Sequence, residues 1–183
     1  YLNYKLYKEI KLRKETQKEL VSLATNDTLT KVFNRRKIEN ICEEEIKLAL
    51  RYNTHFSIIF FDFNDFKPIN DNYGHHAGDE VLVKIANFIS QKIRNSDSFG
   101  RWGGDEFLII LPHTNISQAN SLIENLQKFI SEINYSFNKN LKVSCSFGSY
   151  EYKNGNNLDD MIKNADKSMY EAKMNHKKKK GLI

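Results

Sequence analysis

The chain has 183 residues, of which 28 are Lys or Arg and 23 are Asp or Glu, so its formal net charge is +5. Its length favours one domain with an appendage over two full domains. An apolar fraction of 40%, with 12 Phe and 9 Tyr, supports a hydrophobic core and argues against wholesale disorder. No run of about 18 uncharged apolar residues occurs, so the sequence predicts no membrane-spanning helix.

The positive charge is concentrated at the two ends of the chain. Residues 1–25 carry +3 and residues 171–183 carry +4, which leaves −2 for the segment between them. A nucleic-acid-binding domain is expected to carry its basic patch on the folded part, so this class of function is not favoured. Cys42 and Cys145 stand among apolar neighbours, which is typical of buried thiols in a reducing compartment.

The first 25 residues are predicted to form one helix, because they contain no Pro or Gly and are rich in Lys, Glu and Leu. The positions that follow Leu6 at alternating intervals of three and four residues should be apolar in a coiled coil. Two of them are the polar residues Arg13 and Gln17, so the apolar stripe of this helix is weak. Two interpretations stay open: a solvated connector helix, or a marginal coiled coil that needs more chain upstream. Because the sequence begins at Tyr1, we expect it to be a piece of a longer protein.

Helices and strands are predicted to alternate along the rest of the chain. Apolar residues at helical spacing indicate the helices, and short apolar or alternating runs indicate the strands. The expected elements are a helix capped by Asn34 and ending near Asn53, a strand at 56–63, a polar, turn-rich segment at 64–79, a helix reaching residue 93, strands at 98–102 and 106–111, a helix at 117–133, a strand at 143–150 and a helix at 158–174. This order predicts an α/β fold in which helices cover a mixed sheet.

Three carboxylates stand out at the ends of predicted strands. Asp62 closes the first strand, and the adjacent pair Asp105 and Glu106 follows two glycines at a predicted hairpin tip. Adjacent carboxylates repel each other, so placing them at a tight turn indicates a bound cation, although a solvated hairpin also explains the pair alone. If the two strands are neighbours, oxygen donors meet at one edge and suit Mg²⁺ or Mn²⁺, which points to phosphoryl or nucleotidyl transfer.

The segment 101–107 reads RWGGDEF and closely resembles the signature of GGDEF domains, the diguanylate cyclases. Other blocks match this family in order, namely Asp27–Thr30, Asn34–Arg36, Asp62–Asp71, Tyr73–His75, Gly78–Asp79, Ala165–Asp166 and Tyr170–Lys173. The resemblance covers residues 26–178, so the expected organisation is a connector helix at 1–25, a GGDEF domain at 26–178 and a basic tail at 179–183.

The resemblance implies a fold like the palm of nucleotide cyclases, an α+β fold with a mainly antiparallel central sheet flanked by helices. It also implies that two GTP molecules are condensed into cyclic di-GMP with release of two pyrophosphates. Each protomer would hold one GTP, so we expect a homodimer in which each 3′-hydroxyl attacks the α-phosphate of the other nucleotide. The expected partners are therefore GTP, cyclic di-GMP and a second copy of the chain, and no nucleic acid.

Residue roles are implied by the positions that match the family. Two Mg²⁺ or Mn²⁺ ions per half-site would be bound by Asp62, the backbone carbonyl of Phe63, Asp105 and Glu106. The residues implied in catalysis are Asp105, which would help to deprotonate the 3′-hydroxyl, Glu106 and Lys67. The residues implied in substrate binding are Asn64, Asp65 and Phe66 through their backbone amides, Lys67, Asn70, Asp79, Gly103, Gly104, Lys173 and Lys177.

Asn70 and Asp79 match the family positions that bind the guanine edge. An amide and a carboxylate together can pair with O6 and the N–H donors of guanine, and adenine would leave these groups unpaired. Local roles stay open beside this one, because Asn70 can cap a turn and Asp79 can stabilise the first turn of a helix.

Arg94 and Asp97 match the inhibitory Arg-x-x-Asp motif of the family, which binds the product away from the active site. A guanidinium can bind a guanine edge or a phosphate, and a carboxylate can accept from guanine N–H groups. The resemblance therefore predicts product inhibition, with an ion pair within a helix as the alternative. A non-enzymatic receptor for cyclic di-GMP is the second functional hypothesis, and it would predict loss of the metal-binding carboxylates.

The chain departs from the family pattern at three places. Asn64 stands at the second acidic position of the motif that ends the first strand, where its backbone amide can still bind phosphate. Lys31 and Val32 stand where the family usually has Gly and Leu, and 176–178 reads His-Lys-Lys where it usually has Gly-Arg-Asn. Lys177 keeps the charge but not the bidentate geometry of arginine, which predicts weaker phosphate binding unless the lysine run compensates. We expect a cytoplasmic domain that is controlled by a sensor further upstream, held in a membrane or outside one.

Overall fold

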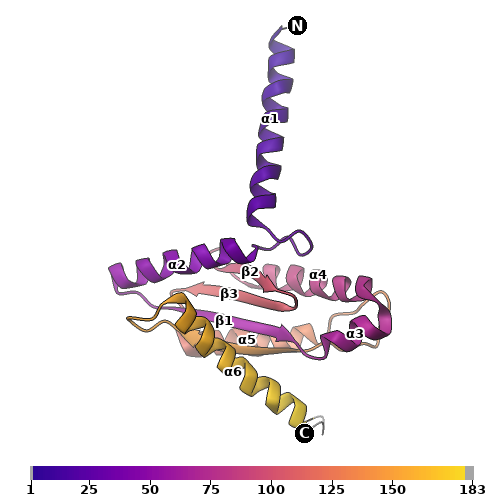
Figure 1. Ribbon diagram of the computed structural model, residues 1–183, viewed down its shortest axis with the longest axis vertical. Helices are drawn as coiled ribbons and strands as arrows, with labels where there is room; N and C mark the ends of the chain where they lie inside the picture. The colour runs from indigo at the N-terminus through magenta and orange to yellow at the C-terminus, as the bar shows by residue number, and fades with distance from the viewer. Residues whose placement is uncertain (1, 180–183) are drawn as a thin grey trace.

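The computed structural model describes residues 2–179 and shows helices packed on both faces of one four-stranded sheet (Figure 1). Its elements in chain order are α1 (Leu2–Thr25), α2 (Arg35–Tyr52), β1 (Phe56–Phe63), α3 (Phe66–Tyr73), α4 (His75–Lys92), β2 (Ser98–Gly103), β3 (Glu106–Pro112), α5 (Ile116–Ile130), β4 (Cys145–Glu151) and α6 (Leu158–Lys179). The predicted α+β fold class is confirmed.

The strands lie in the order β2-β3-β1-β4, and all three pairings are antiparallel. Every residue of β1 is buried, as its run of Phe and Ile predicts for a central strand. Among the described residues, parallel pairing is limited to an isolated bridge between Phe33 and Gly100, so the mixed character expected of the sheet is confined to that bridge.

The two faces of β1 contribute to two separate hydrophobic cores, because successive side chains of a strand point to opposite faces. Phe61 and its odd-numbered neighbours pack with residues of α4 and α5. Phe60 and Ile58 pack on the other face with residues of α2 and α6. The sheet is thus held between two helical layers, and α6 lies on the face from which Asp62 also projects.

The second predicted helix is confirmed at both of its ends. The side chain of Asn34 accepts a hydrogen bond from the backbone N–H of Lys37, which satisfies a donor of the first turn of α2. Asn53 ends the helix in the left-handed conformation with φ of 52°, which asparagine tolerates well.

The expectation of a turn-rich segment at 64–79 is wrong, because α3 and the first part of α4 occupy it. Pro68 fits within the first turn of α3, where a backbone N–H has no acceptor inside the helix. Gly74, with φ of 83°, separates the two helices. The last helix is longer than predicted and reaches Lys179, and the expected tail lies outside the described residues from 180 onward.

Helix α1 extends away from the rest of the domain (Figure 1). Its larger apolar side chains are exposed, among them Leu6, Ile10, Leu20 and Leu23. The predicted helix is therefore present, while the choice between a connector and half of a coiled coil stays open. None of the helices in the described part of the chain combines the length and apolar character that crossing a membrane requires.

A close approach between β4 and α6 depends on Gly148. A Cβ at this position would lie 2.0 Å from the carbonyl oxygen of Ala165 and 2.3 Å from the backbone nitrogen of Met169. Both atoms belong to the helix backbone and cannot move aside as a flexible side chain would. We expect Gly148→Ala to lower the free energy of unfolding by about 3 kcal/mol in urea denaturation, because the helix must shift away from the strand.

Gly103→Ala is the matched control, because a Cβ at Gly103 would meet no heavy atom within 4 Å. Its expected cost is below about 1 kcal/mol. Equal losses in the two variants would contradict the close packing of α6 on β4.

Candidate active site

The two strands that carry the acidic residues are neighbours in the sheet, because β1 and β3 pair antiparallel, which meets the condition stated for the three carboxylates. Their register pairs Phe61 with Phe107, so the end of β1 lies beside the start of β3. This arrangement brings Asp62 next to Glu106, with Asp105 one residue before it. Phe63, the last residue of β1, has a fully buried side chain.

The turn between β2 and β3 leaves open space beside the carboxylates. The pairing register shifts between Arg101 and Gly103, and Gly104 adopts a left-handed conformation with φ of 53°. A Cβ on either glycine would meet no heavy atom within 4 Å. Backbone without side chains at an open tip lets a large ligand approach Asp105 and Glu106 closely.

The site concentrates negative charge in a partly buried place. Burial raises the pKa of Asp62, and the nearby charges of Asp105 and Asp166 raise it further, while contact with Lys173 partly offsets this. Burial also raises the pKa of Glu106, and Asp105, Asp62 and Asp166 add to that effect. A divalent cation among these carboxylates would relieve both the repulsion and the cost of burial.

The two oxygens of Asp62 have different surroundings. The ammonium of Lys173, on α6, donates to Oδ2, while Oδ1 is buried without a hydrogen-bond partner in the described structure. An orphaned carboxylate oxygen among further carboxylates suits a hard cation such as Mg²⁺. Within residues 2–179, however, no three His, Cys, Asp or Glu side chains are already arranged around a common metal position. The donor chemistry fits, and ion binding would require side chains to move.

Asp166 is a member of this cluster that sequence reasoning placed only in the closing helix of the family pattern. It stands seven residues before Lys173 on α6, so the two side chains lie on the same face of the helix. Its charge raises the pKa of both Asp62 and Glu106. That spacing was the one signal in the sequence that could have linked Asp166 to the site. Lys177 follows one turn later and is half-buried.

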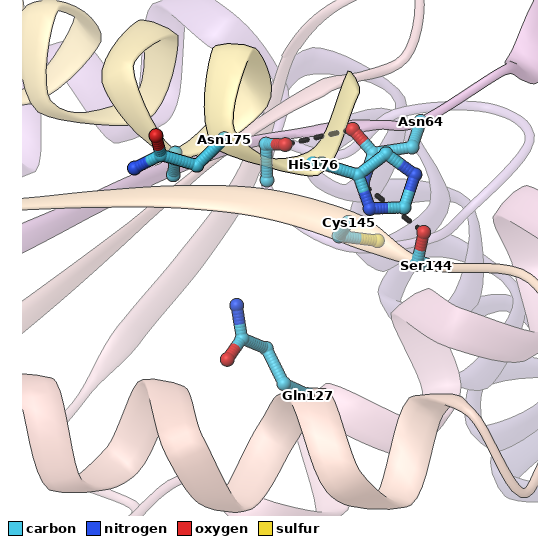
Figure 2. A pocket seen from close by; sticks show the side chains of 8 residues that line it. Asn64, Gln127, Ser144, Cys145, Asn175 and His176 are labelled. Carbon is cyan, nitrogen blue, oxygen red and sulfur yellow. Dashed lines mark hydrogen bonds between the residues drawn. The ribbon is translucent and has the colours of Figure 1, made fainter. Parts of the chain in front are cut away.

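Asn64 anchors the loop after β1 to strand β4. Its side-chain amide donates to Ser144 Oγ at 3.0 Å and its Oδ1 accepts from Ser146 Oγ at 2.7 Å. Its backbone N–H donates to the carbonyl oxygen of Ser144 at 2.9 Å and is thus already engaged. Figure 2 shows Asn64 at the rim of a cavity of about 340 Å³ between α5 and the end of α6, where His176 and Gln127 also lie.

The residues expected to contact guanine lie on α3 and α4. A Cβ at Gly78 would be 2.0 Å from Asn70 Oδ1, so the amide of Asn70 rests directly against the backbone of α4. Asp79 follows Gly78 and is exposed in the second turn of α4, which excludes the alternative of a first-turn carboxylate. Lys67 is exposed on α3.

Arg94 and Asp97 lie in the turn between α4 and β2, so the alternative of an ion pair within a helix is wrong. Asp97 Oδ2 accepts from the backbone N–H of Arg94 at 2.8 Å, which leaves the exposed guanidinium outside this contact. Both residues line a cavity of about 310 Å³, together with Asn26, Thr30 and Lys31 from the segment after α1.

Arg101 fixes the hairpin tip, a role that sequence reasoning missed. Its Nε and one terminal nitrogen donate to the carbonyl oxygen of Gly104 at 2.9 and 2.7 Å. The other terminal nitrogen pairs with Asp27 at 3.2 Å. Burial opposes ionisation of Asp27, but hydrogen bonds from Thr30 and the charge of Arg101 outweigh it, so the pKa of Asp27 is lowered. The segment after α1 is thus tied to the tip that carries Asp105.

Comparison with known proteins shows one family over most of the chain. The family model described as "Diguanylate cyclase, GGDEF domain" matches residues 24–179. The bifunctional diguanylate cyclase/cyclic di-GMP phosphodiesterase MucR of Pseudomonas aeruginosa is 36% identical over 157 residues, which is 85% of this chain and 23% of MucR. Diguanylate cyclase DgcM of Escherichia coli is 32% identical over 165 residues, which is 90% of this chain and 40% of DgcM.

A solved structure extends the likeness to the fold. The coiled coil and GGDEF domain of DgcB from Caulobacter crescentus, in complex with c-di-GMP, superposes with a TM-score of 0.85 at 25% identity. The match covers 92% of this chain and 91% of that one. By contrast, the chain spans between about a quarter and two fifths of the two curated relatives.

The pair between Asp27 and Arg101 predicts a pH-dependent contribution to stability. Because the pKa of Asp27 is lowered in the folded state, the stabilisation is complete above the usual value of 3.8 and is lost as the pH falls below it. Asp27→Asn should cost about 2 kcal/mol of unfolding free energy at pH 7, because Arg101 loses its charged partner. The difference from wild type should shrink at pH 3, as measured by urea denaturation.

Glu9→Gln is the control, since it removes a carboxylate from an exposed pair with Arg13 on α1. Its expected cost is below about 0.5 kcal/mol at either pH. A loss at Asp27→Asn that stays the same from pH 7 to pH 3 would contradict the charged pair.

Proposed function

This chain belongs to the GGDEF family of diguanylate cyclases, and we propose that it condenses two GTP molecules into cyclic di-GMP with release of two pyrophosphates. The main support for this proposal is that the pairing of β1 with β3 brings Asp62, Asp105 and Glu106 together beside an open glycine turn. The retention of all three carboxylates also argues against a receptor without catalytic activity.

We propose that one group of residues binds the guanine base of GTP and another group binds its phosphates. Asn70, held against α4 at Gly78, and Asp79 would pair with the guanine edge. The backbone amides of Asp65 and Phe66 would bind the phosphates, at the N-terminus of α3. The cationic side chains of Lys67, Lys173 and Lys177 would add point charges to the same phosphates.

Divalent ions fit the donor atoms of this site. Asp62, the carbonyl of Phe63, Asp105 and Glu106 would hold two Mg²⁺ or Mn²⁺ ions, which would neutralise charge on the triphosphate. Asp105, at the open tip, would accept the proton of the 3′-hydroxyl. The β1–β3 pairing keeps this carboxylate beside Glu106, whose raised pKa reflects the charge gathered there.

Two copies of the chain would be needed for one turnover. The described domain presents one set of these residues, and condensation needs two nucleotides that face each other. We propose that the active form is a homodimer in which α1 of each copy contributes exposed apolar side chains to the contact. In the full protein, α1 would connect an upstream sensor to the domain and so control this pairing.

The decisive experiment is to incubate the purified chain with GTP and Mg²⁺ and to measure cyclic di-GMP by chromatography. Turnover per protomer should rise with protein concentration, because the half-sites come from two copies. Glu106→Gln should reduce the rate at least about a hundredfold, since a metal-binding carboxylate is lost.

Glu124→Gln, on the exposed face of α5, is the matched control and should keep the wild-type rate. ATP in place of GTP should give no cyclic product. Absence of cyclic di-GMP from a verified dimer would refute the proposed function, and full activity of Glu106→Gln would refute the metal assignment.

Product inhibition is proposed at the cavity lined by Arg94 and Asp97. The exposed guanidinium of Arg94 can bind a guanine edge or a phosphate of cyclic di-GMP, and Asp97 lies beside it. We expect Arg94→Ala to weaken binding of cyclic di-GMP at least about tenfold in calorimetry and to raise the inhibitory concentration equally, with the initial rate unchanged.

The control is Arg51→Ala, which removes an arginine in the last turn of α2 and should leave product inhibition intact. Inhibition that survives Arg94→Ala unchanged would place the inhibitory site elsewhere.

A further inference from the structure

Lys173 forms an ion pair with Asp62, a contact that its proposed binding of phosphate does not explain. Lys173 reaches Asp62 from α6, across 111 residues of sequence, and its ammonium donates to Oδ2. The lysine side chain is 32% exposed, whereas that of Asp62 is only 9% exposed. Asp62 is therefore the buried partner, and Lys173 is the partner that can move toward solvent.

Lys173 occupies one of the two oxygens through which Asp62 could bind a metal ion. Oδ2 is taken by Lys173, and Oδ1 is buried without a hydrogen-bond partner in the described structure. An ion that approached Oδ2 would meet the ammonium at the same oxygen, and two cations on one oxygen repel each other. Lys173 and a divalent cation therefore compete for Asp62.

We infer that Lys173 acts as an internal counter-ion that occupies the metal-binding oxygen of Asp62 until a nucleotide arrives with its metal. The inference rests on the proposed function for the identity of the phosphates that would receive Lys173 afterwards. Lysine suits this role, because its charge sits on a flexible stem of four carbons and its three N–H donors can exchange one oxygen for another.

The surroundings of Asp62 make a nearby cation necessary. A buried carboxylate near Asp105, Glu106 and Asp166 is costly without a cation, as its raised pKa reflects. Lys173 supplies that cation from within the chain. Metal alone must displace the ammonium from Asp62 Oδ2 without supplying a new anion, whereas a nucleotide with metal offers Lys173 a phosphate. Lys173 thus makes the metal and the nucleotide bind together rather than separately.

The test measures Mn²⁺ binding to the nucleotide-free chain, with free Mn²⁺ counted by electron paramagnetic resonance. Lys173→Met should bind Mn²⁺ about tenfold more tightly than wild type, because the competing charge is gone, an effect comparable to that of one neighbouring charge on a carboxylate. Lys177→Met removes an equal charge one turn further along α6 and should change the affinity less than about twofold. Adding Asp62→Asn to Lys173→Met should abolish the gain.

A second measurement separates this role from a structural one. In excess Mn²⁺, Lys173→Met should bind 3′-deoxy-GTP, which lacks the attacking hydroxyl, more weakly than wild type, since a phosphate contact is lost. The same substitution therefore tightens binding of the metal alone and weakens binding of the nucleotide. Unchanged or weaker Mn²⁺ binding, or an equal gain in Lys177→Met, would overturn the inference.

Loss of the partly buried pair is also expected to lower the midpoint of thermal unfolding of Lys173→Met. Mn²⁺ should then restore that midpoint, because the ion replaces the missing charge at Asp62. A purely structural lysine predicts that Mn²⁺ raises the midpoint no more in Lys173→Met than in wild type, and that result would overturn the inference. None of these three measurements requires turnover, so a chain that produces no cyclic di-GMP would refute the proposed function and leave this test valid.

Discussion

The repulsion among carboxylates at the end of β1 is the constraint around which the site is built. Antiparallel pairing with β3 brings Asp62, Asp105 and Glu106 together, and burial makes their charges more costly. The fold sustains this arrangement because β1 is held by neighbours on both sides and by cores on both faces. A strand secured in this way can keep an ionised side chain at its end, where an edge strand would fray.

Two basic side chains offset that repulsion in different ways. Arg101 holds the backbone of the hairpin tip through Gly104 and makes no hydrogen bond to the three carboxylates among the contacts described. Lys173 instead contacts Asp62 directly from α6. Its reach depends on how closely α6 packs on β4, which Gly148 permits by having no side chain. The position of one glycine in the sheet thus governs the electrostatics of the site.

The sequence predicted what local patterns encode, and it missed what long-range contacts create. The apolar run at 56–63 and the cap at Asn34 reproduce β1 and the start of α2, since burial and capping act within a few residues. Helix α3 has eight residues, too few for a clear apolar period, so the sequence pattern of this segment predicts turns instead of a helix. The contacts of Lys173 with Asp62 and of Arg101 with Asp27 span 111 and 74 residues, so no local pattern signals them.

The segment 26–33 connects three parts of the molecule that the sequence presents separately. It follows α1 directly, it holds Arg101 through Asp27, and it lines the cavity of Arg94 and Asp97. A movement of α1 and a ligand in that cavity would act on the same few residues, and these residues hold the tip that carries Asp105 and Glu106. The position of α1 and a ligand in the cavity would therefore both act on the hairpin tip, through the pair of Asp27 with Arg101 and through the backbone hydrogen bonds of Phe33 to Phe99 and Arg101.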